Sequence, residues 1–493
     1  GAARVAELCG RLPLALRIAG ARLAAHPDLS LSAFADRLSD ARRRLDELRH
    51  ADLAVRTSFT ASLEGLAAEP DGDTLVRTFV LLGLLDGPDV ATPVVTALTG
   101  LSPEHTRTAL ERLAEAQLLS AAGPGRYGMH DLVRLYARER AHEDLPEETR
   151  AAAWGRAMRH YLATCRSAAL MLDQSPDHRH SIGPATRPED QGEVRFADRR
   201  AAIRWIDAEH DNLLAAVRQA ATASGDEGPS FATGLSAALF RPFDMRGKYE
   251  DRVTVGRLAL GAACRIGDLC AEAQALNDLG WACLVAGDLD AAVDHLERSV
   301  ARWRQTDMRL GTAYSVANLG SLYASQRNNE AALINCRWSV EVFREVGDRH
   351  GEARALINLA SSHQRSGRYA EAIAANERSL ELHTELGHPR GQAIASGNLA
   401  ESHRLNGSPD LAVPLFERAI TAIREVGDRG AEAEFHWFLG AALYTLGHHD
   451  RARDRWRRSV ALLQDMGALS ADEAEAILAD PVPETPEPIL RTM

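Results

Sequence analysis

The stretch NLGSLYASQRNNEAALINC, residues 318–336, returns 40 residues later as NLASSHQRSGRYAEAIAAN, residues 358–376. Both pieces begin with Asn-Leu, follow the leucine with a small residue, pass through a polar turn and place an alanine at the same distance from the leucine. Self-similarity at a fixed interval is typical of repeat proteins, in which one structural unit is stacked many times. The fold is therefore predicted from this interval of 40 residues.

The same interval runs through the C-terminal half of the chain. Six leucines keep it: Leu239, Leu279, Leu319, Leu359, Leu399 and Leu439. A small residue follows five of them: Gly280, Gly320, Ala360, Ala400 and Gly440. A turn position comes eight residues after each leucine: Gly247, Gly287, Arg327, Gly367, Gly407 and Gly447. Alanine recurs in the next segment: Ala292, Ala332, Ala372, Ala412 and Ala452. A second turn series closes the units: Gly267, Asp307, Gly347, Gly387, Gly427 and Gly467.

These series predict two antiparallel helices per unit, because a glycine after a helix can adopt the left-handed conformation that ends it. The small residues let the paired helices approach closely. One helical hairpin cannot bury its apolar side alone, so six units over residues 229–470 are expected to stack into a right-handed α-solenoid with a concave face. The pattern resembles the tetratricopeptide repeat, in its subclass with 40-residue units. This resemblance implies that the first helix of each unit lines the concave face.

An asparagine precedes three of the register leucines: Asn318, Asn358 and Asn398. In tetratricopeptide repeats an asparagine here often hydrogen-bonds the backbone of an extended peptide, so the resemblance implies a ligand groove. Capping or bridging of neighbouring helices is the alternative role. Arg354, Arg365 and Arg404 fall at further first-helix positions and would favour an acidic ligand, since charge-assisted hydrogen bonds are the stronger ones. Ordinary solvated surface arginine is the alternative for these three.

The N-terminal part has a different organisation. The segment CGRLPLALRIAGARL, residues 9–23, resembles the G-x-P-L-A motif of NB-ARC domains, the switch ATPase module of STAND proteins. In that family the proline of the motif packs against adenine, and the matching residue here is Pro13. Residues 1–49 are accordingly predicted to be part of an NB-ARC helical subdomain.

Residues 50–145 are predicted to form a winged-helix domain. Helix signals cover 73–85, 90–99 and 103–119, the last with Ser102 as N-cap and Pro103 at the first helical position. The Gly-rich segment AAGPGRYG, residues 121–128, predicts a hairpin wing. The next residues, Met129, His130 and Asp131, match the MHD motif of NB-ARC proteins, in which the histidine reaches the β-phosphate of bound ADP. A capping or core histidine is the alternative for His130.

A helical connector is predicted over residues 146–228, with RAAIRWIDAEHDNLLAAVRQAA, residues 200–221, as its clearest amphipathic stretch. A mobile loop is expected at 173–196. His178 and His180 in that loop have no partner cluster, so no metal site is predicted. Residues 471–493 remain as a C-terminal tail.

The whole order resembles the C-terminal part of large actinobacterial regulators of the SARP class, the AfsR type. The fold class expected is therefore mainly α: a partial NB-ARC helical domain and winged helix followed by a tetratricopeptide-repeat solenoid. The resemblance implies the sensory part of a STAND-class transcriptional regulator, whose repeats bind a protein, peptide or small ligand and control a nucleotide switch. A constitutive scaffold that holds a peptide without switching is the alternative.

The nucleotide of that switch, ADP or ATP, is expected in the complete protein and no cofactor in this chain. The P-loop pattern needs a lysine, and the single lysine, Lys248, is followed by tyrosine in a repeat turn. No nucleophile, metal set or acid and base pair is apparent either, so the chain is not expected to be an enzyme. The chain begins without methionine and resembles the tail of something longer.

Composition restricts the partners further. The formal net charge of −12 disfavours nucleic acid binding, because phosphate contacts need clustered Lys and Arg. No stretch is long and apolar enough to predict a membrane span. The six cysteines lack zinc-ligand spacing and are expected to be buried thiols of a cytoplasmic protein. A protein or peptide in the repeat groove is the expected partner, and self-association on activation is a further expectation.

Overall fold

The structure is a computed structural model. It describes residues 2–11, 13–26, 29–40, 44–50, 53–172, 196–306 and 308–492, with only the backbone described at 13, 14, 49, 50, 53, 54 and 490–492. The chain divides into two compact units. The described residues of the first unit lie within Gly1–Tyr161 and Glu209–Ala216, and those of the second lie within Leu162–Glu189, Val194–Ala208 and Val217–Met493.

The first unit begins with short helices and a small hairpin. Its elements here are α1 (Ala2–Leu8), α2 (Pro13–Ala25), α3 (Leu31–Ser39), α4 (Arg44–Glu47), β1 (Arg49–His50), β2 (Leu53–Ala54) and α5 (Val55–Ala67). Ser30 caps α3, since its hydroxyl accepts a hydrogen bond from the backbone amide of Ala33 at 3.1 Å. Helix α1 packs against α3, and the buried Phe34 and Leu38 supply the apolar side of α3.

Four helices and a three-stranded antiparallel sheet follow in the first unit. The elements are α6 (Gly72–Leu82), β3 (Asp89–Ala91), α7 (Thr92–Thr99), α8 (Pro103–Glu115), β4 (Ser120–Gly123), β5 (Arg126–Gly128) and α9 (Asp131–Asp144). The strand order is β3-β5-β4. The predicted helices and the predicted hairpin are confirmed at these places, as is Ser102 as the N-cap of α8, with its hydroxyl accepting from the amide of His105.

The predicted connector is helical, with α10 (Glu147–Leu172) and α12 (Arg199–Thr222). The expected mobile loop, with His178 and His180, lies outside the described residues apart from Phe196. Within the first unit, Asn212 of α12 donates to carboxylates of Asp89 at 2.9 Å and Glu209 at 2.8 Å, and Arg126 pairs with both acids. Although burial opposes it, hydrogen bonds to Glu209 and Asp89 raise the pKa of Arg126. The polar segment EHDN of the connector thus has a structural role.

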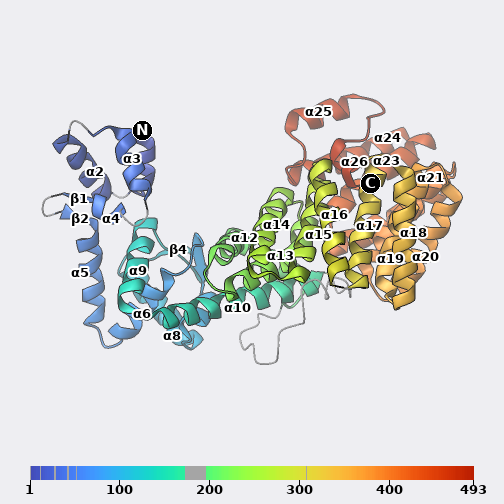
Figure 1. Ribbon diagram of the computed structural model, residues 1–493. Coiled ribbons are helices and arrows are strands. Elements are labelled where there is room, and N and C mark those ends of the chain that lie inside the picture. Colours follow the sequence, from blue (N-terminus) through green and yellow to red (C-terminus); the bar gives the residue numbers. More distant parts are fainter. Residues whose placement is uncertain are drawn as a thin grey trace. The chain divides into compact units, whose positions relative to one another are not determined.

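The second unit is built from helical hairpins, stacked side by side (Figure 1). The hairpin helices are α13 (Glu227–Met245), α14 (Tyr249–Ile266), α15 (Leu269–Ala286), α16 (Leu289–Gln305), α17 (Arg309–Ser325), α18 (Asn329–Val346), α19 (Arg349–Arg365), α20 (Tyr369–Glu385), α21 (Pro389–Leu405), α22 (Pro409–Val426), α23 (Arg429–Thr445) and α24 (His449–Asp465). Two shorter helices, α25 (Ala471–Ala479) and α26 (Glu487–Thr492), complete the unit. Six helix pairs are therefore confirmed within the described part of residues 227–465.

The register positions form the contacts between the paired helices. All five alanines of the predicted series are fully buried. A methyl group on Gly320 would lie 2.4 Å from the sulfur of Cys336, and one on Gly280 would lie 2.6 Å from Cγ of Leu296. These distances are shorter than any van der Waals contact, so a small residue after the leucine is what lets the second helix pack against the first.

The turns also follow the prediction. Glycines with φ between 61° and 86° end helices in both turn series. Arg327 takes the glycine position of the third unit with φ of 59°, a conformation that is costly for a residue with a Cβ atom. Asp307 lies outside the described residues.

Two of the six cysteines differ from the expectation. Cys264 and Cys270 are exposed, so the prediction that all six cysteines are buried was wrong for these two, which lie beside the turn between α14 and α15.

No helix among the described residues combines the length and apolar character needed to cross a membrane.

Candidate ligand-binding groove

A cavity of about 280 Å³ lies along the first helices of the repeats. Its lining comes mainly from helices α13, α15, α17, α19, α21 and α23. The second helices contribute only Tyr249, Trp303 and His383 to the described lining. The first helix of each unit therefore faces the cavity, as the resemblance implied.

The lining side chains repeat at the same interval as the sequence. One column of lining residues holds Gln274, Tyr314, Arg354, Ile394 and Glu434. A second column holds Asp278, Asn318, Asn358 and Asn398. Because residues 40 positions apart occupy equivalent places in successive hairpins, each column runs along the solenoid. Two parallel rows of mostly polar side chains thus line one cavity.

The asparagines of the second column also bridge neighbouring repeats. The side-chain amide of Asn318 donates to the side-chain oxygen of Asn277 at 2.8 Å, and that of Asn358 donates to the carbonyl of Ala317 at 3.1 Å. The backbone carbonyl of Asn398 accepts from Gln364 at 3.3 Å. The three asparagines therefore reach the cavity while Asn318 and Asn358 tie adjacent first helices together.

Of the three arginines predicted for the groove, one lines the cavity. Arg354 lines the cavity, with its guanidinium carbon 4.5 Å from the centre of the Tyr314 ring. Arg365 and Arg404 are not among the lining residues. The guanidinium of Arg404 instead bonds the carboxylate of Glu401 on its own helix, at 2.6 and 2.7 Å.

Charged groups are concentrated where α13 and α15 meet the cavity. The carboxylate of Asp244 lies between Arg241 and Arg252, and Arg252 also lies over the ring of Phe240. Burial raises the pKa of Asp278 to about 6, although amide donors of Asn277 and Gln274 act in the opposite direction. Asp278 is therefore an acid that changes charge close to neutral pH.

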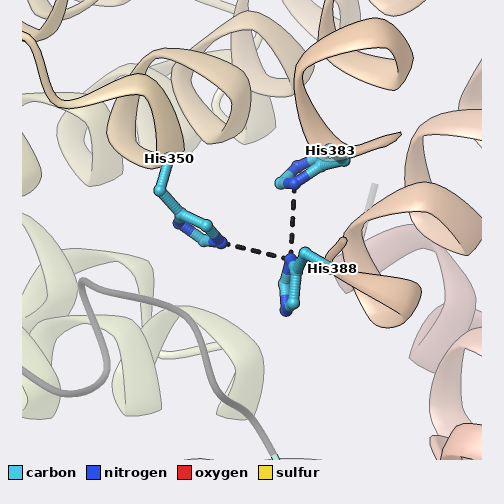
Figure 2. Close-up of side chains that lie close together, drawn as sticks. All are labelled: His350, His383 and His388. Atoms are coloured by element: carbon cyan, nitrogen blue, oxygen red, sulfur yellow. Dashed lines mark hydrogen bonds between the residues drawn. The ribbon is translucent and has the colours of Figure 1, made fainter. Parts of the chain in front are cut away.

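Three buried histidines line the same cavity farther along the solenoid: His350, His383 and His388. His350 is the second residue of α19, His383 lies in the last turn of α20, and His388 immediately precedes α21. The three rings point toward one another (Figure 2). Nδ1 of His388 lies 3.1 Å from Nε2 of His350 and 3.3 Å from Nδ1 of His383.

The sequence prediction of no metal site missed this cluster. Neither the 33 residues from His350 to His383 nor the five to His388 match a metal-binding motif. The sequence feature that could have revealed the cluster is the departure of His383 from the repeat pattern. At the position of His383 the other units carry apolar residues: Ala263, Trp303, Phe343, Ile423 and Leu463.

In the first unit the two motifs predicted to meet a nucleotide lie close together. Nε2 of His130 donates to the backbone carbonyl of Gly10 at 2.7 Å, and Nδ1 accepts from the backbone amide of Leu132 at 3.2 Å. His130 therefore caps α9 and contacts the GRLPLAL segment at once. Pro13 begins α2, and its side chain lies outside the described residues.

Residues 309–385 and 391–465 match the tetratricopeptide repeat family. The solenoid is a tetratricopeptide-repeat array. The register of leucine, small residue, turn and alanine that this array keeps is the one from which the fold was predicted.

Beyond the tetratricopeptide repeats, the chain is similar to regulatory proteins. It is 34% identical over 357 residues to the regulatory protein AfsR of Streptomyces coelicolor, covering 64% of this chain and 35% of that protein. It is 31% identical over 367 residues to the regulatory protein AfsR of Streptomyces griseus, covering 67% and 37%. The predicted resemblance to AfsR-type regulators is thus confirmed, and the matched segment spans about a third of the length of these relatives.

The chain is also similar to solved structures. One is a STAND protein with a tetratricopeptide repeat sensor from Pyrococcus horikoshii, with 12% identity, 94% of this chain and 71% of that chain covered, and a TM-score of 0.38. Another is a Rap protein in complex with competence and sporulation factor, with 10% identity, 87% and 97% covered, and a TM-score of 0.44.

Proposed function

We propose that this chain is the sensory part of a signal-transducing transcriptional regulator, and that its tetratricopeptide groove binds an extended peptide or protein segment. The observation that carries the proposal is the pair of side-chain columns along one cavity. An extended peptide repeats its backbone amides and carbonyls at a regular interval, so a ligand that spans several repeats can meet one polar side chain from each.

The chemistry of the groove supports a polar, mixed-charge ligand. The column from Gln274 to Glu434 offers an amide, a phenol, a guanidinium, an aliphatic side chain and a carboxylate in turn. Arg354 can pair with an acidic group, and the acids Asp278 and Glu434 lie toward the two ends of the columns. A ligand with an acidic group opposite Arg354 and basic or neutral groups toward its ends therefore fits best.

Regulation is supported by the similarity to regulatory proteins and by the contact between His130 and Gly10. We infer that occupancy of the groove controls a nucleotide switch in the complete protein, with Pro13 and His130 at the rim of an ADP or ATP site. Such control requires that the ligand bind two states unequally. We also propose that the protein self-associates on activation. This chain itself is proposed to make no direct contact with nucleic acid.

Peptide selection tests the binding proposal. A display library of random peptides would be panned against the immobilised 493-residue chain, and a selected peptide would then carry a photoreactive residue. Crosslinks are expected at first-helix residues such as Tyr314 and Ile394. Crosslinks confined to second-helix residues such as Ile334, which is 62% exposed, would contradict the proposal.

The alternative, a constitutive scaffold, is separated by a second measurement. In a protein that includes the nucleotide site, a groove-binding peptide should change the rate of ADP release if the repeats act as a sensor. A peptide that binds the groove and leaves the rate unchanged would support the scaffold.

A further inference from the structure

We propose that His350, His383 and His388 form a binding site for a transition-metal ion of the zinc type, open to the groove. The proposal does not depend on peptide binding or on nucleotide switching. It rests on the convergence of three imidazoles, on the departure of His383 and His388 from the repeat pattern and on the distances between the ring nitrogens.

Each histidine stands where the other repeats place a different kind of residue. His383 takes the place of Trp303 and Phe343, and like these rings it packs against a glycine eight residues later, so that a methyl group on Gly391 would lie 2.3 Å from its Nδ1. A buried polar ring thus replaces a buried apolar one, with an exposed fraction of only 2%. A buried polar side chain needs a polar partner, and the ring of His388 is one that His383 meets.

His388 also departs from its column. In three other repeats this position is an aspartate whose carboxylate caps the next helix: Asp268, Asp348 and Asp428. His388 makes no side-chain cap for α21, and its ring is directed at His350 and His383 instead. His350 itself takes the position of Leu310 in the preceding repeat. The other repeats share no residue type at this position, which holds Cys270, Leu310, Arg390 and Gly430. Two departures from the repeat pattern and a third histidine, from three elements, therefore meet at one point.

The distances fit a single cation. Four ligands at about 2.0–2.1 Å in a tetrahedron are separated from one another by about 3.3 Å. The two measured nitrogen separations, 3.1 and 3.3 Å, are close to that edge, and all three nitrogens lie within 4.8 Å of one another. Binding of the ion would require the rings to turn until the third pair, within 4.8 Å, reaches the same spacing.

The protons and lone pairs of the ring nitrogens also favour a bound cation. Nδ1 of His388 faces a nitrogen of each other ring, and a ring nitrogen carries either one proton or one lone pair. If Nδ1 of His388 is protonated, it has one hydrogen to share between two neighbouring nitrogens. If it is not protonated, it has one lone pair for two possible donors. A cation bound by the three nitrogens accepts one lone pair from each ring, so neither of the two contacts then needs a proton.

The donor set defines the class of ion. Imidazole nitrogens suit zinc, cobalt, nickel and copper, whereas magnesium and calcium prefer oxygen ligands. Three protein ligands leave a fourth position on a tetrahedral ion. Since all three histidines line the cavity, that position faces the groove, where a carboxylate, thiolate or water can occupy it.

The test is metal binding by the full 493-residue chain. Zn²⁺ would be titrated in competition with a chromophoric chelator, and Co²⁺ would report tetrahedral geometry through its visible absorption bands. One high-affinity ion per chain is expected. Zn²⁺ should also raise the melting temperature, by an amount that grows with its concentration.

Two variants remove a ligand while restoring the residue of the preceding repeat, so both should fold: His383→Phe, after Phe343, and His350→Leu, after Leu310. Each should weaken Zn²⁺ binding by more than about 100-fold, because loss of an outer partner of a metal ligand alone costs about 10–100-fold. His363→Gln changes a buried histidine outside the cluster and should leave Zn²⁺ affinity unchanged.

Two results would overturn the proposal. One is the lack of a stoichiometric Zn²⁺ or Co²⁺ site in the wild-type chain. The other is binding that survives in His383→Phe and disappears in Cys264→Ser or Cys270→Ser, which would assign the ion to the exposed thiols.

Discussion

The side-chain amide of Asn318 donates a 2.8 Å hydrogen bond to the side-chain oxygen of Asn277, one repeat earlier in the solenoid. Both residues are buried and both line the groove. Asn318 is thus placed to hold two repeats together and to border the cavity. The two roles predict different consequences of its removal.

Asn318→Ala should lower the free energy of unfolding by about 1–3 kcal/mol, because the buried side-chain oxygen of Asn277 loses its hydrogen-bond donor. Denaturant unfolding measures the loss. Asn406→Ala, at an exposed turn, is the control and should stay within about 0.5 kcal/mol of wild type. A wild-type stability for Asn318→Ala would mean that the residue serves recognition alone.

The pKa of Asp278 predicts a pH-dependent stability. Burial raises it to about 6, against about 3.9 in an unfolded chain, so the native state binds the proton more tightly. The carboxylate therefore costs stability above pH 6, and this cost disappears as the pH falls toward about 4.

Asp278→Asn keeps the shape and removes the charge, so it should stabilise the chain at pH 7 by up to about 2–3 kcal/mol. The gain should shrink to near zero at about pH 4. Unfolding measured across this range checks both statements, with exposed Asp410→Asn as the control. A gain that grows toward acidic pH would show that the sign is wrong.

Arg327 has a left-handed backbone, with φ of 59°, where most other units have glycine. Arg327→Gly should stabilise the chain by up to about 1 kcal/mol, since relief of the Cβ penalty exceeds the added entropy of the unfolded glycine. Gly367→Ala, with φ of 71° in the next unit, should destabilise by about 1 kcal/mol. Thermal melts compare the pair, and equal melting temperatures would argue against a left-handed turn at 327.

His130 joins the start of α9 to Gly10. His130→Ala should increase hydrogen exchange at the Leu132 amide by about fivefold, because a lost N-cap costs about 1 kcal/mol. Gly10→Ala should have the same effect, since its methyl group would lie 2.0 Å from Cε1 of His130. Exposed His105→Ala is the control, and exchange that Gly10→Ala leaves unchanged would mean that the contact does not form.

Most of the solenoid was predictable because its signals are local and repeated. A glycine that ends a helix, or an alanine between two helices, keeps its role in most units, so five series in one register predicted the hairpins. That the first helices face the groove was implied by the resemblance to tetratricopeptide repeats. The alignment of Asn318, Asn358 and Asn398 followed from the register, and their place in the cavity lining from the resemblance.

The positions of Arg365 and Arg404 and of the histidine cluster could not be predicted from the repeat register alone. Asn358 and Asn398 are the last lining residues of α19 and α21. Arg365 and Arg404 lie six or seven residues farther on, about 9–10 Å along the helix axis. His350, His383 and His388 come from three elements in two repeats, and only tertiary packing brings them together.

The central claim, that the concave groove is the binding site, is tested most directly by one matched pair of variants. Ile394→Arg places a long charged side chain in the cavity, and Ile334→Arg places the same side chain on an exposed second-helix position. The affinity of a selected peptide would be measured for both by calorimetry. A loss of at least about tenfold with Ile394→Arg, and none with Ile334→Arg, is predicted, since a filled cavity excludes the ligand. Wild-type affinity in Ile394→Arg together with a loss in Ile334→Arg would contradict the account.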